Sequence, residues 1–161
     1  GPAYMRVGRN PVEDVYTSGN YEFQLSKAIT LRNGDSLSII TFGETVKIAL
    51  DAAELMSNRG INCRVINMHT IKPIDKECII KAAKETGAII TIEEHSILSG
   101  FGAAVAETVV QHCPVPMKIM GIPDEPAIPG KSKEVFAYYG ISAENLCLEA
   151  EKLINMKRNG W

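Results

Sequence analysis

The sequence predicts an α/β domain in which four or five mostly parallel strands alternate with helices. Short apolar runs that are typical of buried strands recur along the chain, and segments with apolar residues at helical spacing separate them. Parallel neighbouring strands require crossover connections of this kind. The alternation is most compact in residues 67–107, which pass from a strand through a short helix, a second strand and a glycine loop into another helix.

The first predicted elements lie before Gly60. An extended pattern in residues 23–31 is followed by turn-forming residues at 33–35, which predicts a small hairpin or an edge strand. Residues 36–42 are a candidate for a buried strand, and a helix is expected between Gly43 and Gly60. The apolar face of that helix carries Val46, Ala49, Leu50, Ala53 and Met56.

Three further strands are predicted at residues 61–68, 88–93 and 117–122, each of which is largely apolar. Between the first two, a short helix is expected to begin near Asp75 and to end at Gly87. The Asp75 carboxylate is well placed to accept hydrogen bonds from the free backbone amides at the start of that helix.

The remaining helices follow from periodicity and from breaker residues. Pro114 and Pro116 close a helix that precedes the last strand. Its apolar positions are Phe101, Ala104, Val105, Thr108 and Val109. After the irregular, proline-rich residues 123–130, a short helix is expected around residues 133–139, and a final helix is expected to open at Ser142.

The composition limits the classes of function. With 161 residues, 45% hydrophobic residues and a net charge of -2, the chain fits one globular domain and lacks the basic field that attracts nucleic acid. No apolar run approaches the roughly 20 residues that a membrane span needs, and the N-terminus does not have the layout of a signal peptide. We expect a cytoplasmic protein that contacts neither nucleic acid nor membrane.

The cysteines and histidines do not form a metal-binding pattern. Four cysteines and three histidines are scattered along the chain, so no pair has the spacing of a zinc knuckle, a redox dithiol or a helical histidine pair. We interpret the cysteines as buried thiols and expect no metal site within the chain.

A glycine loop before a helix gives the first candidate site. Gly100 and Gly102 resemble part of a dinucleotide fingerprint, since free amides at a helix start favour an anion. However, Val105 stands where the third glycine belongs, and several residues separate the strand from Gly100. The alternative, close backbone packing at the entrance of the helix, is favoured.

Glu93, Glu94 and His95 give the second candidate, an acid/base cluster at the end of a strand. Adjacent residues of a strand point to opposite faces, so Glu93 and Glu94 are not expected to act together. The favoured interpretation is a strand tip whose carboxylates bind loop amides or a neighbouring subunit. A regulatory ligand site between Glu93 and Gly102 stays open, and no residue of the chain is identified as catalytic.

The segments NMHTIKPID, TGAIITIEEHSILSGFGAAVAE and KEVFAYYGIS resemble the C-terminal domain of transketolase-type thiamine diphosphate enzymes. The resemblance covers nearly the whole chain and is strongest to split transketolases, in which this domain lies on a separate C-terminal subunit. It implies a three-layer αβα domain with a mostly parallel five-stranded sheet and one antiparallel edge strand.

The same resemblance divides the chain. GPAYMRVGRNP resembles the final strand of the pyrimidine-binding domain that precedes this domain in the family, and residues 3–7 alone are consistent with a brief strand. Residues 1–22 are therefore expected to be the tail of that domain and a linker, and residues 23–161 the transketolase C-terminal domain. Whether Gly1 and Pro2 are native is left open.

The resemblance also implies a function for the intact enzyme, the transfer of two-carbon ketol units between sugar phosphates with thiamine diphosphate and Mg²⁺. The residues that hold these cofactors in the family lie outside residues 1–161, so the fragment alone is expected to be inactive and to bind neither. Arg9 resembles a family arginine that binds the sugar phosphate, for which a guanidinium fork is suited. For Arg6, an ion pair is the alternative to a phosphate contact.

The implied partners are the N-terminal transketolase subunit or domain and a second copy of the chain in a homodimer. Several alternatives stay open. These are 1-deoxy-D-xylulose-5-phosphate synthase, the beta subunit of a 2-oxo-acid dehydrogenase, and a non-catalytic module for metabolite binding or dimerisation.

Overall fold

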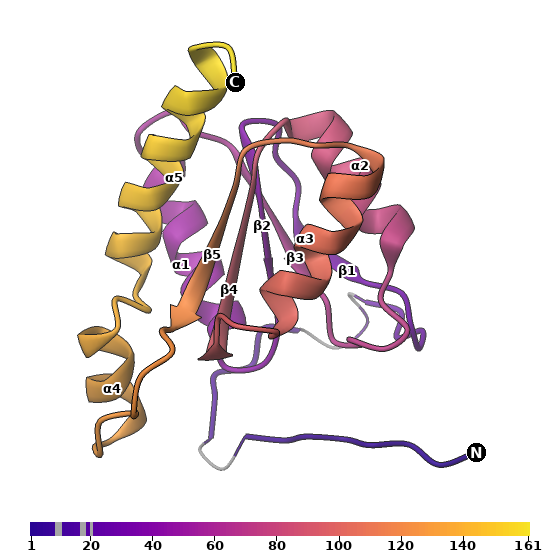
Figure 1. Ribbon diagram of the computed structural model, residues 1–161, viewed down its shortest axis with the longest axis vertical. Coiled ribbons are helices and arrows are strands. Elements are labelled where there is room, and N and C mark those ends of the chain that lie inside the picture. The colour runs from indigo at the N-terminus through magenta and orange to yellow at the C-terminus, as the bar shows by residue number, and fades with distance from the viewer. Residues whose placement is uncertain (9–10, 17–18, 20) are drawn as a thin grey trace.

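The computed structural model describes residues 1–8, 11–16, 19 and 21–161, and within them five strands form one sheet with helices on both sides (Figure 1). The elements, in chain order, are β1 (Ile29–Arg32), β2 (Leu37–Thr41), α1 (Thr45–Ser57), β3 (Cys63–Asn67), α2 (Lys76–Thr86), β4 (Ile89–Ser96), α3 (Phe101–His112), β5 (Met117–Ile122), α4 (Ser132–Tyr138) and α5 (Ala143–Arg158).

The strands lie in the order β1-β3-β2-β4-β5, with β1 antiparallel to β3 and every other neighbouring pair parallel. The predicted sheet with one antiparallel edge strand is therefore confirmed. The hairpin alternative for residues 23–42 is wrong, because β1 pairs with β3 and not with β2. The turn instead packs against the start of β3, where the amides of Asp35 and Ser36 both donate to the carbonyl of Asn62.

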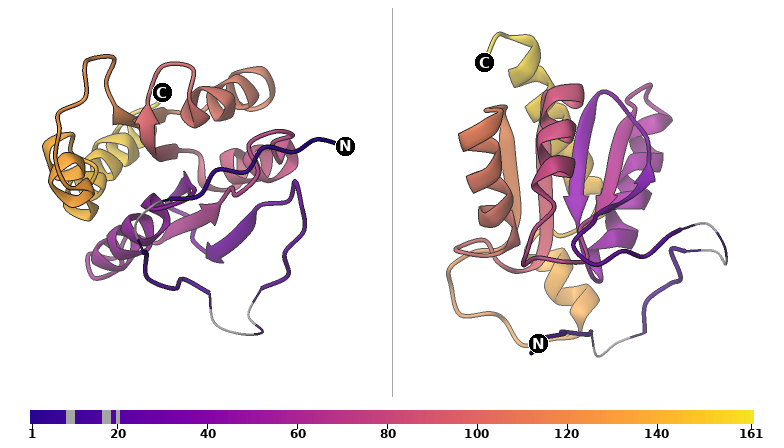
Figure 2. Two further views of the ribbon diagram at one scale, coloured as in Figure 1. Left: turned by 90° about the horizontal axis from the view of Figure 1, so that it is seen from below. Right: turned by 90° about the vertical axis from the view of Figure 1, so that its right-hand side faces the viewer.

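The three-layer arrangement follows from the alternation of side chains along each strand. In β2, Ile39 joins the core on one face of the sheet and Ile40 joins the core on the other. Helices α1 and α5 cover the first face, and α2 and α3 cover the second (Figures 1 and 2). Both faces are thus buried, which explains why the parallel strands are continuous apolar runs.

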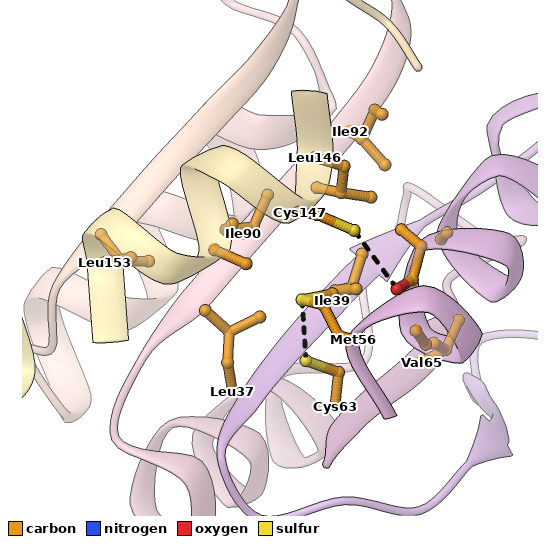
Figure 3. Close-up of a cluster of buried hydrophobic side chains, with 14 of the residues drawn as sticks. Leu37, Ile39, Met56, Cys63, Val65, Ile90, Ile92, Leu146, Cys147 and Leu153 are labelled. Carbon is orange, nitrogen blue, oxygen red and sulfur yellow. Dashed lines mark hydrogen bonds between the residues drawn. The ribbon is translucent and has the colours of Figure 1, made fainter. Parts of the chain in front are cut away.

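The larger core lies beneath α1 and α5 (Figure 3). Its buried side chains include Leu37, Ile39, Met56, Cys63, Val65, Ile90, Ile92, Leu146, Cys147 and Leu153. The Cys63 thiol contacts the Met56 sulfur at 3.6 Å, and the Cys147 thiol donates to the carbonyl of Ala52 at 3.5 Å. Among these, Cys63 and Cys147 pack as small apolar side chains.

Helix termini agree with the sequence signals. The Asp75 carboxylate caps α2 by accepting from the amide of Cys78 at 3.1 Å, and Gly87 ends that helix in the left-handed conformation. The Ser142 hydroxyl caps α5 by accepting from the amide of Asn145. These caps confirm the expected start and end of α2 and the expected start of α5.

The brief strand predicted at residues 3–7 is not formed. Tyr4 and Met5 are 90% and 84% exposed, and no strand of the described residues lies beside them to complete a ladder. A strand requires such a neighbour, because its amides and carbonyls point sideways. The segment instead crosses the edge of the sheet where the parallel strands end (Figure 2).

Candidate functional site

The candidate site is the edge of the sheet at which β2, β3 and β4 end. Open α/β sheets bind ligands at such carboxyl edges, especially between the two strands where the order reverses. Here the reversal falls between β2 and β4, because the chain passes from β2 outward to β3 and returns to the other side at β4. The residues that follow these two strands therefore decide what this crevice contains.

Glu93 fills the position that an anion would take at the start of α3. Its side chain is 1% exposed, and its two carboxylate oxygens each accept a hydrogen bond of 2.8 Å, from the amides of Phe101 and Gly102. These amides are the free donors of the helix N-terminus, where negative charge is favourable. The protein's own carboxylate thus occupies the site that a phosphate would need.

The two glycines of this loop are required by close packing, to which Glu93, Ile119 and Thr91 contribute. A Cβ at Gly100 would lie 2.5 Å from a Glu93 carboxylate oxygen, and a Cβ at Gly102 would lie 2.5 Å from Ile119 and 2.6 Å from Thr91. The packing interpretation is confirmed for this loop. The dinucleotide fingerprint is not supported, because the amides it would offer are already bonded.

Glu94 points away from Glu93 and forms an ion pair with Arg6, whose Nη1 donates to Glu94 Oε1 at 3.0 Å. The Glu94 side chain is only 9% exposed, whereas that of Arg6 is 49% exposed. The expected separation of Glu93 and Glu94 is therefore confirmed, and Arg6 forms the ion pair that the sequence left as an alternative. A charge-assisted hydrogen bond to a mostly buried carboxylate is stronger than an ordinary surface ion pair.

His95 completes this contact. Its Nε2 also meets the Arg6 guanidinium, and its ring stacks on Phe42 with centroids 5.6 Å apart. Burial lowers the pKa of His95, and the Arg6 charge lowers it further, while Glu93 acts in the opposite direction. The imidazole is thus held neutral at physiological pH, which leaves a ring nitrogen able to accept from Arg6.

Glu44, in the loop after β2, adds a second carboxylate beside Arg6. Burial raises the pKa of Glu44, Glu94 raises it further, and Arg6 opposes this change. Gly8 approaches the same carboxylate closely, since a Cβ there would lie 2.7 Å from Glu44 Oε1. Arg6 therefore lies between two acidic groups that come from the ends of neighbouring strands.

We call residues 1–8 and 11–16 the N-terminal strap, because they lie across this edge of the sheet. Besides the contact of Arg6 with the end of β4, Glu13 pairs with Lys47 of α1 at 3.3 Å, just after β2. The Tyr16 hydroxyl then accepts a hydrogen bond from the side-chain Nδ2 of Asn67 at the end of β3. The strap thus meets β4, β2 and β3 in their spatial order before the chain enters β1.

Two hollows flank the strap. One, of about 610 Å³, extends toward Tyr16, Asn67 and His69. The other, of about 1170 Å³, extends toward α4 and the residues before it, including Lys131. Arg6, Glu44 and Lys47 line both hollows. The contacts that the strap makes with the domain at these residues therefore separate the two hollows.

Two features of the described residues bear on thiamine diphosphate and Mg²⁺. The α3 amides are bonded to Glu93, and the described part of the chain contains no group of three histidine, cysteine or acidic side chains that could hold a metal ion. Arg9, the expected phosphate ligand, lies outside the described residues.

Within the described chain, no helix is long and apolar enough to cross a membrane.

Sequence reasoning found part of this site. The tip residues Glu93, Glu94 and His95 were recognised from their place after an apolar run, and Arg6 from its charge. Glu44 and Lys47 were missed, because an acidic and a basic residue at the start of an amphipathic helix look like ordinary solvated positions. Their proximity to Arg6 and Glu13 depends on the path of the strap, for which the sequence carries no signal.

The fold and the strap-covered edge define a three-layer α/β domain that receives a polypeptide segment across its strand ends. The family description "Transketolase, C-terminal domain" matches residues 26–146, and the chain belongs to this family. It is 50% identical to a subunit of the apulose-4-phosphate transketolase of Phocaeicola vulgatus, over 95% of this chain and 49% of that protein.

Other relatives support the same assignment. The 6-deoxy-6-sulfo-D-fructose transketolase subunit of a Clostridium species is 36% identical over 98% of this chain and 48% of its own length. A 1-deoxy-D-xylulose-5-phosphate synthase of Gloeothece citriformis is 37% identical over 94% of this chain but only 24% of its own length. The chain thus spans about half the length of the transketolase subunits that it matches.

A solved structure described as a split gene transketolase, inactive beta4 tetramer, has a TM-score of 0.86 and 31% identity to this chain. It matches 92% of this chain and 48% of its own. A Pichia stipitis transketolase shares the fold, with a TM-score of 0.62 at 19% identity over 81% of this chain and 18% of its own. The predicted transketolase C-terminal domain fold is therefore confirmed.

Proposed function

We propose that this chain is the C-terminal domain of the second subunit of a split transketolase, an enzyme that transfers two-carbon ketol units between sugar phosphates with thiamine diphosphate and Mg²⁺. The observation that carries the proposal is the 50% identity to the Phocaeicola vulgatus transketolase subunit over 95% of this chain. The chain covers about half of that relative, so the remaining polypeptide supplies the cofactor site.

A second candidate is 1-deoxy-D-xylulose-5-phosphate synthase, which the 37% identity to one such enzyme favours. That relative is matched over only a quarter of its length, whereas two subunits of split transketolases are matched over nearly half. Both candidates use the same type of cofactor and differ in substrate. The transketolase assignment is preferred because the higher identity and the shared subunit organisation agree.

Within the intact enzyme this domain has a supporting role. Residues 23–161 form the C-terminal domain, and residues 1–22 are the linker and the tail of the preceding domain. The anion site at α3 is filled by Glu93, which supports a cofactor bound elsewhere. Arg9 contributes its guanidinium to the phosphate of the sugar substrate.

The proposed partners are the N-terminal transketolase subunit and a second copy of the subunit in a homodimer. Apolar side chains exposed in the strap and in the residues after it support an interface there. They are Tyr4, Met5, Val7, Val12, Tyr21, Phe23 and Leu25. The four cysteines are unpaired, which supports a reducing compartment, the cytoplasm.

Reconstitution tests the proposed function. The full-length subunit that contains this chain is co-expressed with its N-terminal partner and assayed for two-carbon transfer between sugar phosphates. Transfer that requires both subunits, thiamine diphosphate and Mg²⁺ supports the proposal. A cofactor-loaded assembly that condenses pyruvate with glyceraldehyde 3-phosphate, but never moves a ketol unit, would assign it to the synthase instead.

The role of Arg9 is tested in the same assembly. Arg9→Gln is expected to raise KM for a phosphorylated donor by at least about tenfold, because a guanidinium to phosphate contact is strong. Arg158→Gln, at the exposed end of α5, is the matched control and is expected to leave KM unchanged. An unchanged KM in Arg9→Gln would remove Arg9 from the substrate site.

A further inference from the structure

We propose that a proton-sensitive latch holds the N-terminal strap: neutral His95 and the Glu94 carboxylate bind Arg6 at the end of β4, and a proton on His95 releases it. Release is local, because it frees residues 4–8 and leaves the sheet and its helices folded. The proposal goes beyond the transferase function and depends on neither its substrates nor its partner subunit.

Arg6 is the side chain through which this part of the strap reaches the domain. Its neighbours Tyr4, Met5 and Val7 are all exposed, whereas Arg6 Nη1 donates to a carboxylate oxygen of Glu94 at 3.0 Å. The Arg6 side chain is itself 49% exposed, so water can solvate the guanidinium once the contact is lost. Docking and release therefore depend on a side chain that is stable in either state.

The groups that receive Arg6 are fixed by the fold. The carboxylate of Glu93 bonds the amides of Phe101 and Gly102, which holds the end of β4 against the start of α3. The ring of His95 stacks on Phe42, and Phe42 packs edge-on against Phe101. The domain thus supplies the rigid half of the latch, and the strap supplies the half that can move.

The contact with the strap uses the lone pair of the His95 imidazole. A guanidinium has only N–H donors, so Nε2 of His95 accepts from Arg6 and the proton of the neutral ring is on Nδ1. That Nδ1 atom is buried and has no hydrogen-bond partner among the described residues. A second proton therefore goes to Nε2, where it removes the acceptor and directs an N–H at the guanidinium.

Protonation of His95 also changes the partner of Glu94. The same nitrogen of Arg6, Nη1, meets both Glu94 Oε1 and His95 Nε2, so these two atoms face one point. A charged imidazolium at that point repels the guanidinium and is itself a donor that Glu94 can accept from. Glu94 thus exchanges one cationic donor for another, and Arg6 is released to water.

The charged groups around His95 act in the direction that this coupling requires. Burial lowers the pKa of His95, the charge of Arg6 lowers it further, and Glu93 on the same strand opposes both. Glu94 is paired to Arg6, and Phe42, which stacks on the ring, is uncharged. Because linkage is reciprocal, a docked Arg6 that disfavours the proton is itself disfavoured by the proton.

Glu44 gives a second response of the same sign. Its carboxylate lies beside the strap, since a Cβ at Gly8 would be 2.7 Å from Glu44 Oε1. Burial raises the pKa of Glu44, Glu94 raises it further, and Arg6 opposes this change. A proton on Glu44 removes a negative charge from the surroundings of Arg6, so a falling pH weakens the site from both sides.

The latch also decides whether the two hollows at the strand ends are separate. Arg6 and Glu44 line both hollows, so docked Arg6 lies between them. Lys47, which pairs with Glu13 and Asp51, holds the strap farther along. Release of Arg6 therefore joins the hollows on the side of β4, while the strap stays attached beside α1.

An NMR titration of the chain tests the latch. The protonated fraction of His95 is read from its own ring-proton shift, and the mobility of the strap is read from backbone ¹⁵N relaxation of residues 5–8. Order parameters of the wild type are expected above about 0.7 while the ring is neutral and below about 0.6 once it is protonated. Values that stay the same across the titration of His95 would overturn the proposal.

Two histidine variants show whether His95 is the responsible group. His95→Gln keeps an acceptor for Arg6 but does not titrate, so residues 5–8 are expected to stay ordered, above about 0.7, over the same pH range. His112→Gln, at the exposed end of α3, is the matched control and should release the strap as the wild type does. Release in His95→Gln at the pH found for the wild type would overturn the proposal.

Glu44→Gln separates the two titrating groups. It is expected to keep the release of residues 5–8 on protonation of His95, because the acceptor on the imidazole is still lost. Absence of any pH response in Glu44→Gln would make Glu44 the switch and would overturn the assignment to His95.

The reciprocal effect is measured in Arg6→Gln. The pKa of His95 is expected to rise toward its usual value of about 6.5, and residues 5–8 are expected to be mobile at every pH. Arg158→Gln, at the exposed end of α5, is the control and should change neither. An unchanged pKa of His95 in Arg6→Gln would overturn the coupling. Ketol transfer enters none of these measurements, so they decide the latch whether or not the proposed function holds.

Discussion

The carboxylate of Glu93 lies 2.8 Å from the amide nitrogen of Gly102, so the end of β4 and the first turn of α3 are joined by a buried charge-assisted hydrogen bond. A second bond, to the amide of Phe101, uses the other oxygen. This arrangement explains three features of the sequence together. The carboxylate neutralises the helix start, the glycines allow its approach, and Glu94 is directed to the other face.

Replacement of Glu93 tests this connection. Glu93→Gln keeps the shape but presents an amide group to two backbone donors, so one donor loses its acceptor in a buried site. We expect the free energy of unfolding to fall by about 2 kcal/mol. Urea denaturation of Glu107→Gln, on the exposed face of α3, is the control and should stay within about 0.5 kcal/mol of the wild type. Equal stability of Glu93→Gln and the wild type would contradict the capping role.

A methyl group at Gly102 tests the close packing. The Cβ of Gly102→Ala would meet Ile119 at 2.5 Å and Thr91 at 2.6 Å, both fixed within the sheet. The strain is expected to cost about 1–3 kcal/mol of stability. In Gly130→Ala the added Cβ meets a Val135 methyl at 3.3 Å and Glu134 Oε2 at 3.7 Å, both on side chains that can move, so thermal denaturation should find that control close to the wild type.

His95 predicts a loss of stability in acid. Its pKa is lowered in the folded chain by burial and by Arg6, so between that folded value and the usual value of about 6.5 the unfolded chain binds more protons. Stability therefore falls as the pH drops below about 6.5. His95→Gln should flatten this part of the profile, while His112→Gln, on the exposed end of α3, should not. The charged groups that face the ring are Arg6 and Glu93, with Glu94 paired to Arg6, and these are the same residues in both proteins.

If stability fell more steeply with decreasing pH in His95→Gln than in the wild type, His95 would not be the cause of the loss of stability in acid. Glu44 contributes with the opposite sign, because its pKa is raised by burial and by Glu94. Its contribution to stability is lost as the pH rises through its folded pKa. The contributions of His95 and Glu44 are separated by measuring the free energy of unfolding of Glu44→Gln over the same pH range.

The cysteines predict a pattern of alkylation. Burial raises the pKa of Cys63 to about 12 and that of Cys78 to about 11, so both are protonated at pH 8. Mass spectrometry after brief iodoacetamide treatment should find these two sites unmodified in the folded chain and modified after denaturation in urea. Rapid labelling of Cys63 in the folded chain would contradict the packing of that core.

Most of the fold could be predicted from the sequence because its signals are local. The apolar runs of β2, β3, β4 and β5 and the breakers Gly87 and Pro114 need no partner to be recognised. The partner of β1 could not be predicted, since the turn at residues 33–35 allows pairing with either neighbour and packing against β3 decides it. The prediction of a brief strand at residues 3–7 was wrong, because a local sequence pattern does not provide a neighbouring strand with which the segment could pair.

The candidate site divides in the same way. The tip from Glu93 to Gly102 was found because it follows a strand within a short stretch of sequence. The contacts of Arg6 with Glu94 and of Glu13 with Lys47 join residues far apart in the chain, and only the path of the strap brings them together. The spacing of apolar residues along the sequence does not predict the path of the strap.

The most direct test of the central claim, that the cofactor is held by polypeptide outside this domain, is calorimetric titration of thiamine diphosphate with Mg²⁺. We predict no saturable binding by residues 1–161 and saturable binding by the reconstituted assembly of both subunits. Saturable binding by residues 1–161 alone, at micromolar concentrations of the cofactor, would contradict the claim.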